Sequence, residues 1–177
     1  MSELSPMMRH YIDLKEKYKD CILFYRLGDF YEMFFDDAIL ASRELEIVLT
    51  GRDCGLPERA PMCGVPYHSA QNYIDRLIAK GYKVAICEQL SDPAKSKGLV
   101  ERDVIRVVTP GTVVDTASVA ENENNYLLSL CVAEGRVGLA YTDVSTGAFY
   151  VSECAADEGF ASVLGEVARI QPREIIY

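Results

Sequence analysis

YRLGDFYEMFFDD, residues 25–37, is the stretch that best predicts how the first half of the chain folds. The overlapping run CILFYRL, residues 21–27, has the length and aromatic content of a buried strand. Gly28-Asp29 is a turn signal that ends this run. We therefore expect a strand over 21–27, a tight turn, a second strand over 30–35, and a helix capped by Asp36-Asp37.

The second strand carries one acid, Glu32, among aromatic residues. Because side chains alternate along a strand, Phe30 and Glu32 share one face, while Tyr31 and Met33 point to the other and are expected in the core. Two interpretations stay open on periodicity alone. The pair is either part of a half-buried aromatic strand with one solvated acid, or an exposed phenyl ring and an acid that contact an unstacked base.

The rest of the first half predicts a mixed α/β domain over residues 1–114. Helices are expected over the segment that begins at Ser5-Pro6 and over 69–81, with a buried strand over 82–90 and an alternating segment over 100–112. Residues 50–68 are rich in glycine, proline and charge and predict an ordered loop. Residues 91–99 predict a polar loop.

The composition then changes, which predicts a second domain. Residues 115–124 are acidic and polar, as in a linker, and residues 125–177 predict three strands, a helix that stops at Pro172, and the start of another strand. The chain ends at Tyr177 inside that last strand signal. We therefore expect the sequence to be part of a longer protein, with this second domain truncated.

Charge and hydropathy limit the class of protein. Apolar residues make up 49% of the 177, which is enough for a sizeable core. No run is long enough to span a membrane and no signal peptide is visible, so a cytoplasmic protein is expected. Residues 1–112 carry 15 basic and 17 acidic residues and residues 113–177 carry 3 and 10, which gives −2 and −7. Neither half has the basic excess of a DNA binder that needs no other domain.

No metal site or catalytic centre is expected. The six cysteines form no Cys-x-x-Cys pair and there are only two histidines, so we expect buried, reduced thiols. A ribonuclease-H-like nuclease would gather several carboxylates around two metal ions. Asp143 is the one acid suitably placed at a strand end, so we expect it to be a turn or capping acid in a non-catalytic domain.

Several motifs together resemble the MutS family of DNA mismatch-repair proteins. They are LFYR, GDFYEMF and DDA within 23–38, the segment from Ala60 to Thr112, NNYLLSLC at 124–131, GLAYTDVSTGAF at 138–149 and PREIIY at 172–177. These matches cover nearly the whole chain in the family's order. The resemblance implies a mixed-sheet, mismatch-recognition domain followed by the start of a ribonuclease-H-like α/β connector domain.

The resemblance also implies roles for particular residues. Phe30 and Glu32 match the family's Phe-x-Glu pair, so Phe30 is expected to stack at a mispair and Glu32 to bond the mispaired base. Further residues are expected as contacts to the DNA backbone, with Arg102 and His68 ahead of Arg52, Lys95 and Lys97.

The resemblance further implies functions that this sequence does not itself carry. The family protein is a dimeric ATPase that uses ATP and magnesium, but no Gly-x-x-x-x-Gly-Lys-Ser/Thr loop is present, so we expect no enzyme activity and no cofactor here. Mismatched duplex DNA is the expected partner. The alternative is a protein-protein adaptor, in which the acidic second half binds a repair partner such as MutL.

Overall fold

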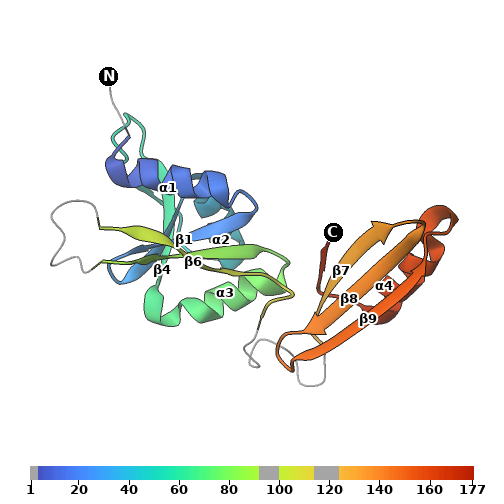
Figure 1. Cartoon of the computed structure of the whole chain (residues 1–177). Helices are drawn as coiled ribbons and strands as arrows, with labels where there is room; N and C mark the ends of the chain where they lie inside the picture. Colours follow the sequence, from blue (N-terminus) through green and yellow to red (C-terminus); the bar gives the residue numbers. More distant parts are fainter. Residues whose placement is uncertain (1–3, 92–99, 114–123) are drawn as a thin grey trace. The chain divides into compact units, whose positions relative to one another are not determined.

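The computed structural model describes residues 4–91, 100–113 and 124–177, and these form two compact units, Met1–Val108 and Thr109–Tyr177. Figure 1 shows both as α/β units, each built on its own sheet. The mixed α/β fold predicted from the sequence is confirmed.

The first unit is built on a six-stranded mixed sheet in the order β3-β4-β2-β1-β5-β6. β1 (Cys21–Leu27) lies at its centre, antiparallel to β2 (Phe30–Phe34) and parallel to β5 (Lys83–Gln89), and β6 (Arg102–Val108) forms one edge. The predicted strand, Gly-Asp turn and strand are therefore present.

The region 50–68 corrects one prediction, because it is not a loop throughout. It contains β3 (Thr50–Arg52) and β4 (Ala60–Pro66), followed by the short 3-10 helix η1 (Tyr67–Ser69). β4 pairs with β2 on one side and β3 on the other, and alternates buried Cys63 and Val65 with less buried residues. Prolines and glycines conceal this strand in the sequence, because its partners supply the stability that its local propensity lacks.

Helices cover both faces of this sheet, as Figure 1 shows for α1 (Pro6–Lys17) and α3 (Ala70–Ala79). α1 begins as predicted, with Ser5 accepting a hydrogen bond from the Met8 N–H. It packs on the face that carries Tyr25 and Phe34. α2 (Phe35–Leu45) lies on the opposite face, where the Ala38 carbonyl accepts a contact from the Cys63 thiol.

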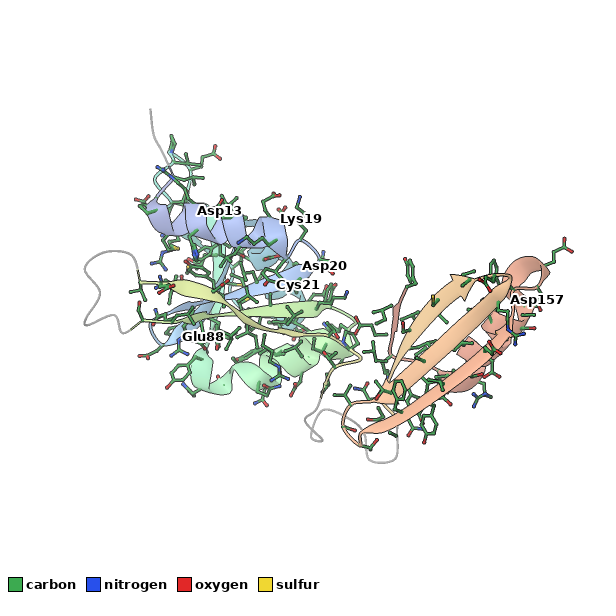
Figure 2. The ribbon with its side chains drawn as sticks, viewed as in Figure 1. Asp13, Lys19, Asp20, Cys21, Glu88 and Asp157 are labelled. Atoms are coloured by element: carbon green, nitrogen blue, oxygen red, sulfur yellow. The ribbon has the colours of Figure 1, made fainter. Side chains whose placement is uncertain are left out.

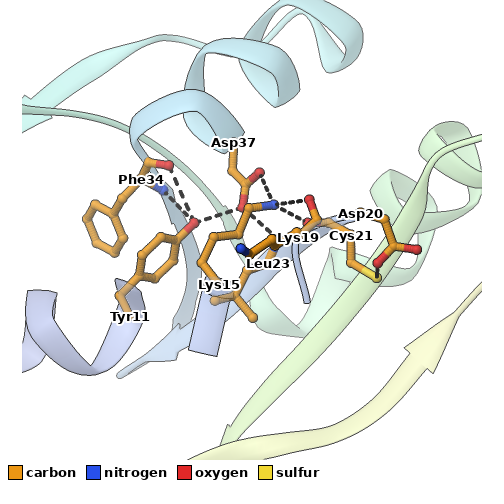
Figure 3. Close-up of polar contacts among 8 residues, drawn as sticks. All are labelled: Tyr11, Lys15, Lys19, Asp20, Cys21, Leu23, Phe34 and Asp37. Atoms are coloured by element: carbon orange, nitrogen blue, oxygen red, sulfur yellow. Dashed lines mark hydrogen bonds and ion pairs between the residues drawn. The ribbon is translucent and has the colours of Figure 1, made fainter. Parts of the chain in front are cut away.

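A buried carboxylate, Asp37, joins three elements of the first unit (Figure 3). Its Oδ2 accepts hydrogen bonds from the Leu23 N–H and the Tyr11 hydroxyl, both at 3.0 Å, and Oδ1 lies 2.8 Å from Lys15 Nζ. The Tyr11 hydroxyl also accepts from the Phe34 N–H at 3.2 Å. Burial, reinforced by the Asp37 charge, raises the pKa of Tyr11 well above its usual value, so Tyr11 stays protonated as a donor.

The start of α2 corrects a second prediction. The helix begins at Phe35, its cap residue is Phe34, and no side chain caps it, so Asp36-Asp37 do not serve as the N-cap. Asp36 is exposed, whereas Asp37 points into the network with α1 and β1. Both acids still lie in the first turn, where negative charge is favourable.

The second unit is a four-stranded sheet in the order β10-β7-β8-β9. β7 (Tyr126–Ala133), β8 (Arg136–Asp143) and β9 (Ala148–Ala155) form an antiparallel meander, and β10 (Glu174–Ile176) runs parallel to β7. Between β9 and β10 lie η2 (Glu158–Phe160) and α4 (Ala161–Ile170). The small core is formed by Leu128, Leu139 and Ile170.

The cysteines are all free thiols, and their burial follows the prediction with exceptions in the second unit. Burial raises the pKa of Cys63 and of Cys87 to about 12, so both are unreactive near neutral pH. Cys131 is exposed and Cys154 is half-buried, because both lie in the second unit, whose buried core is small. Within the described ranges, no helix is long and apolar enough to cross a membrane.

The Asp37 network predicts a large loss of stability in Asp37→Asn. The change leaves Lys15 without its counter-charge and replaces one acceptor oxygen by a donor, so the free energy of unfolding should fall by about 2–4 kcal/mol. Urea unfolding followed by circular dichroism measures this. The matched control, Asp36→Asn, removes the same charge from an exposed neighbour and should change stability by less than about 0.5 kcal/mol. Equal stabilities of the two variants would contradict the structural role of Asp37.

Candidate nucleic-acid interface

Phe30 projects from the end of the sheet as the first residue of β2. Phe30 is 46% exposed, although the next four residues of the strand are buried or half-buried. Phe30 pairs with Leu27 on one side and with Pro66 on the other, so its backbone lies inside the sheet while its ring reaches solvent. This combination of a fixed backbone and a free ring suits insertion into a stack of bases.

The turn before Phe30 is tied down at two points. Gly28 has a φ of +58°, which a residue with a side chain rarely adopts, and the Arg26 guanidinium donates from Nε to the Gly28 carbonyl at 2.6 Å. The Asp29 carbonyl accepts from the Tyr67 N–H at 2.9 Å, which joins the turn to η1. The position of Phe30 is therefore set by two segments about forty residues apart in the sequence, 26–29 and Tyr67.

Glu32 lies two residues further along the same face and is paired with a cation. Its carboxylate accepts a hydrogen bond from Arg52 of β3 and forms an ion pair with it. The Glu32 side chain is 15% exposed and that of Arg52 is 38% exposed. Gly64, opposite Glu32 on β4, makes room for it, since a Cβ there would lie 3.4 Å from Glu32 Cγ and 3.2 Å from the Tyr31 carbonyl oxygen.

A second group of side chains lies on the opposite face of the same sheet end. The Arg26 guanidinium stacks on the exposed Tyr67 ring, with Cζ 3.6 Å from the ring centre. Its Nη1 lies 3.5 Å from Glu88 Oε1. Tyr31 donates its hydroxyl to Glu88, which Figure 2 places on the α3 side of the sheet. Burial and this hydrogen bond raise the pKa of Tyr31 to about 12. Tyr31 is buried here, as expected, and so is Met33.

Arg102 was expected at the DNA backbone, but its guanidinium is used within the fold. It is buried, donates from Nε to the Arg26 carbonyl at 2.8 Å and from Nη1 to the Val100 carbonyl at 2.9 Å, and lies 5.4 Å from the Tyr25 ring centre. These contacts hold β6 against the end of β1. A phosphate contact by Arg102 stays a prediction, and this arrangement leaves it little free surface.

The structure describes two of the other expected backbone contacts, His68 and Arg52. His68 is exposed in η1, where its ring packs edge-on against Tyr67 at 5.8 Å. Arg52 is engaged by Glu32, as described above. Lys95 and Lys97 lie outside the described residues. The roles of all four in DNA binding stay predictions.

Asp143, the last residue of β8, bonds the turn that follows the strand. Its carboxylate accepts from the N–H groups of Asn125, Ser145 and Thr146 and from the Ser145 hydroxyl, at 2.6–3.4 Å. Burial alone would raise the pKa of Asp143, but these hydrogen bonds outweigh it and lower the pKa below its usual value. Among the described residues, no three His, Cys, Asp or Glu side chains could hold a metal ion together.

Sequence reasoning missed the contacts that organise the sheet end. The ion pair of Glu32 with Arg52 crosses β4, which was not expected as a strand, so no spacing rule indicated it. The stacking of Arg26 on Tyr67 likewise joins two distant segments. The sequence feature that could have indicated the ion pair is Arg52 itself, a cation in a segment that can fold back toward Glu32.

Comparison with known proteins places both units in one family. The family model described as MutS domain I matches residues 5–117, and that described as MutS domain II matches residues 125–177. The chain belongs to the MutS family. The mismatch-repair resemblance predicted from the sequence is thereby confirmed.

Individual MutS relatives agree with the family models. The chain is 60% identical over 176 residues to the DNA mismatch repair protein MutS of Acetivibrio thermocellus, and 61% identical over 176 residues to that of Ruminiclostridium cellulolyticum. It is 55% identical over 174 residues to MutS of Clostridium tetani. These alignments cover 98–99% of the chain but 20% of each relative, so the chain spans about a fifth of the length of these MutS proteins.

The buried guanidinium of Arg102 predicts a structural effect in Arg102→Met. Loss of hydrogen bonds to two carbonyls should lower the free energy of unfolding by about 2 kcal/mol. The control Arg106→Met removes the same charge from an exposed position of β6 and should change stability by less than about 0.5 kcal/mol. If Arg102→Met were as stable as wild type and weakened DNA binding with a smaller salt dependence, Arg102 would instead be a phosphate contact.

Proposed function

We propose that this chain recognises mispaired or unpaired bases in duplex DNA by inserting Phe30 at the defect while Glu32 bonds the displaced base. The observation that carries this proposal is the half-exposed Phe30 ring on a backbone that is paired on both sides. Membership of the MutS family supports recognition of mismatched DNA in general.

The energetics of insertion explain why a defect would be preferred. Separating two base pairs costs a few kcal/mol, whereas stacking an aromatic ring on a base returns about 1–3 kcal/mol. A well-stacked duplex therefore opposes insertion, and a mispair or an extra base, which is already poorly stacked, opposes it less. Phe30 would test how easily the duplex deforms and would not read its sequence.

Glu32 adds a directional contact to this test. A carboxylate near phosphates is repelled, which penalises binding to every duplex, and a hydrogen bond to a displaced base edge would offset that penalty at a defect. His68, Lys95 and Lys97 are proposed as further backbone contacts, whereas the guanidinium groups of Arg102 and Arg52 are engaged within the fold as described above.

Other activities are proposed only for a complete MutS protein, because this chain spans 20% of its relatives. They are hydrolysis of ATP with magnesium, dimerisation, and action in the cytoplasm. We assign no reaction and no cofactor to the two domains themselves. The proposed role of the chain is to bind and discriminate.

The wedge predicts that Phe30→Ala abolishes discrimination. Labelled duplexes with one G·T mispair or with full pairing are titrated at low salt, and the preference is the ratio of their dissociation constants. The wild-type chain should prefer the mispaired duplex, and the loss of about 1–3 kcal/mol of stacking should bring the preference of Phe30→Ala close to one.

Ile39→Ala is the matched control for this experiment. Ile39 lies on α2 and is 47% exposed, so its truncation removes a similar exposed apolar group away from the sheet end. Its preference should equal that of wild type. A wild-type chain without preference, or a Phe30→Ala chain that keeps it, would refute the proposed wedge.

A second candidate function, contact with MutL, is favoured by the charge of the second half. Residues 113–177 carry 3 basic and 10 acidic residues, which suits a basic protein surface better than DNA. β9 is an edge strand and exposes Phe149 and Val151 at 65% and 72%. We propose this edge as the surface that meets MutL, with the net negative charge of the second half as a further attraction.

Purified MutL tests this second candidate directly. The chain should retain MutL in a pull-down at low salt, Phe149→Ser should weaken retention, and Phe30→Ala should leave it unchanged, because Phe30 lies in the other unit. High salt should also weaken retention, since charge contributes to the contact. Absence of retention at low salt would count against the adaptor function.

A further inference from the structure

We propose that Arg52 is a positioning residue for mismatch discrimination, acting through Glu32 and not through a DNA phosphate. This inference rests on the proposed function of Phe30 and Glu32, and names the residue that prepares Glu32 for its contact. From the sequence Arg52 was expected only as a backbone contact, and its ion pair with Glu32 is the observation that supports a different role.

The geometry shows why Arg52 is suited to this role. Arg52 pairs with Ala60 in the β3–β4 register, whereas Glu32 pairs with Gly64, so the two residues are offset along the sheet. The guanidinium reaches back across the Phe34 ring, with Cζ 6.0 Å from the ring centre, to bind Glu32. Phe34 is fully buried, so the long side chain of Arg52 passes over a fixed surface.

The hydrogen bond involves one oxygen of the Glu32 carboxylate. Arg52 Nη1 donates to Oε2, and this contact restrains the carboxylate next to Gly64. Among the described residues, the structure gives Oε1 no hydrogen bond, so it is the oxygen that can meet a base edge. A carboxylate held in one orientation loses less freedom on forming that second bond.

Charge gives Arg52 a second effect on Glu32. The Glu32 side chain is 15% exposed, and a duplex that covers it would remove its remaining water. An isolated carboxylate in such a place is strongly unfavourable, whereas an ion-paired carboxylate is tolerated. The Arg52 cation therefore offsets part of the cost of covering the Glu32 side chain with a duplex.

Arg52→Met tests this inference against a simple phosphate contact. If Arg52 orients Glu32, the preference for the G·T duplex should fall about three- to tenfold, the range expected for weakening one ordinary hydrogen bond. If Arg52 binds a phosphate, the affinities for both duplexes should fall by the same factor and the preference should be unchanged. The latter result overturns the inference.

A double-mutant cycle shows whether the effect passes through Glu32. In a Glu32→Ala chain, Arg52→Met should leave the preference unchanged, because the group that it positions is gone. A further fall of equal size in that chain would show that Arg52 acts independently of Glu32, and would overturn the inference. Arg52→Lys keeps the charge and should recover most of the preference.

Arg59→Met is the matched control. Arg59 is an exposed residue between β3 and β4, so its replacement removes the same charge from the same region, and no ion pair of Arg59 is found among the described residues. Its preference should equal that of wild type. Arg59→Met should unfold within about 2 °C of wild type, because its side chain is exposed. Arg52→Met leaves the half-buried Glu32 carboxylate without its cation and should unfold at a somewhat lower temperature, so the duplexes are compared well below both transitions.

Measuring Phe30→Ala in the same series separates the two proposals. Preference lost in Phe30→Ala but kept in Arg52→Met would retain the wedge and refute the role of Arg52. Equal binding of both duplexes by wild type would refute the wedge, and the inference on Arg52 with it.

Discussion

The buried contact of Asp37 with Tyr11, Lys15 and the Leu23 backbone is the interaction on which the first unit depends. It joins α1 to the centre of the sheet and fixes the point where β2 gives way to α2. An unpaired buried carboxylate would be strongly destabilising, so the three elements must come together for any of them to be stable there. Phe30 lies at the other end of β2, where it pairs with Leu27 of β1. The position of β2 in the sheet is therefore fixed at both of its ends.

The face of the sheet that α1 covers also explains why Phe30 and Glu32 are accessible while Phe34 is not. Phe30, Glu32 and Phe34 share this face, and their burial increases along the strand from exposed Phe30 to fully buried Phe34. Met8, Tyr11 and Leu14 of α1 pack with Phe34 and Tyr25, which accounts for the buried end. The same alternation of side chains therefore builds the core at one end of β2 and a contact surface at the other.

Local patterns in the sequence were sufficient for most of the fold. The Gly-Asp turn, the alternation around Glu32 and the Ser5-Pro6 helix start each depend on a few neighbouring residues, and all are present. β4 could not be predicted, because its prolines and glycines are tolerated only through pairing with β2 and β3. Asp37 as a buried acceptor, and Arg52 as the partner of Glu32, are likewise set by tertiary contacts between distant segments.

Pairing of β2 on both sides has a mechanical consequence. A strand between two hydrogen-bonded neighbours cannot move aside unless the whole sheet bends with it, so the tip that bears Phe30 is much stiffer than a loop would be. When a stiff protein element is pressed into a duplex, nearly all of the deformation takes place in the DNA. Such a probe would discriminate between defects by how easily the double helix deforms at that base-pair step, whichever bases are present. One protein surface would then recognise chemically unrelated mispairs.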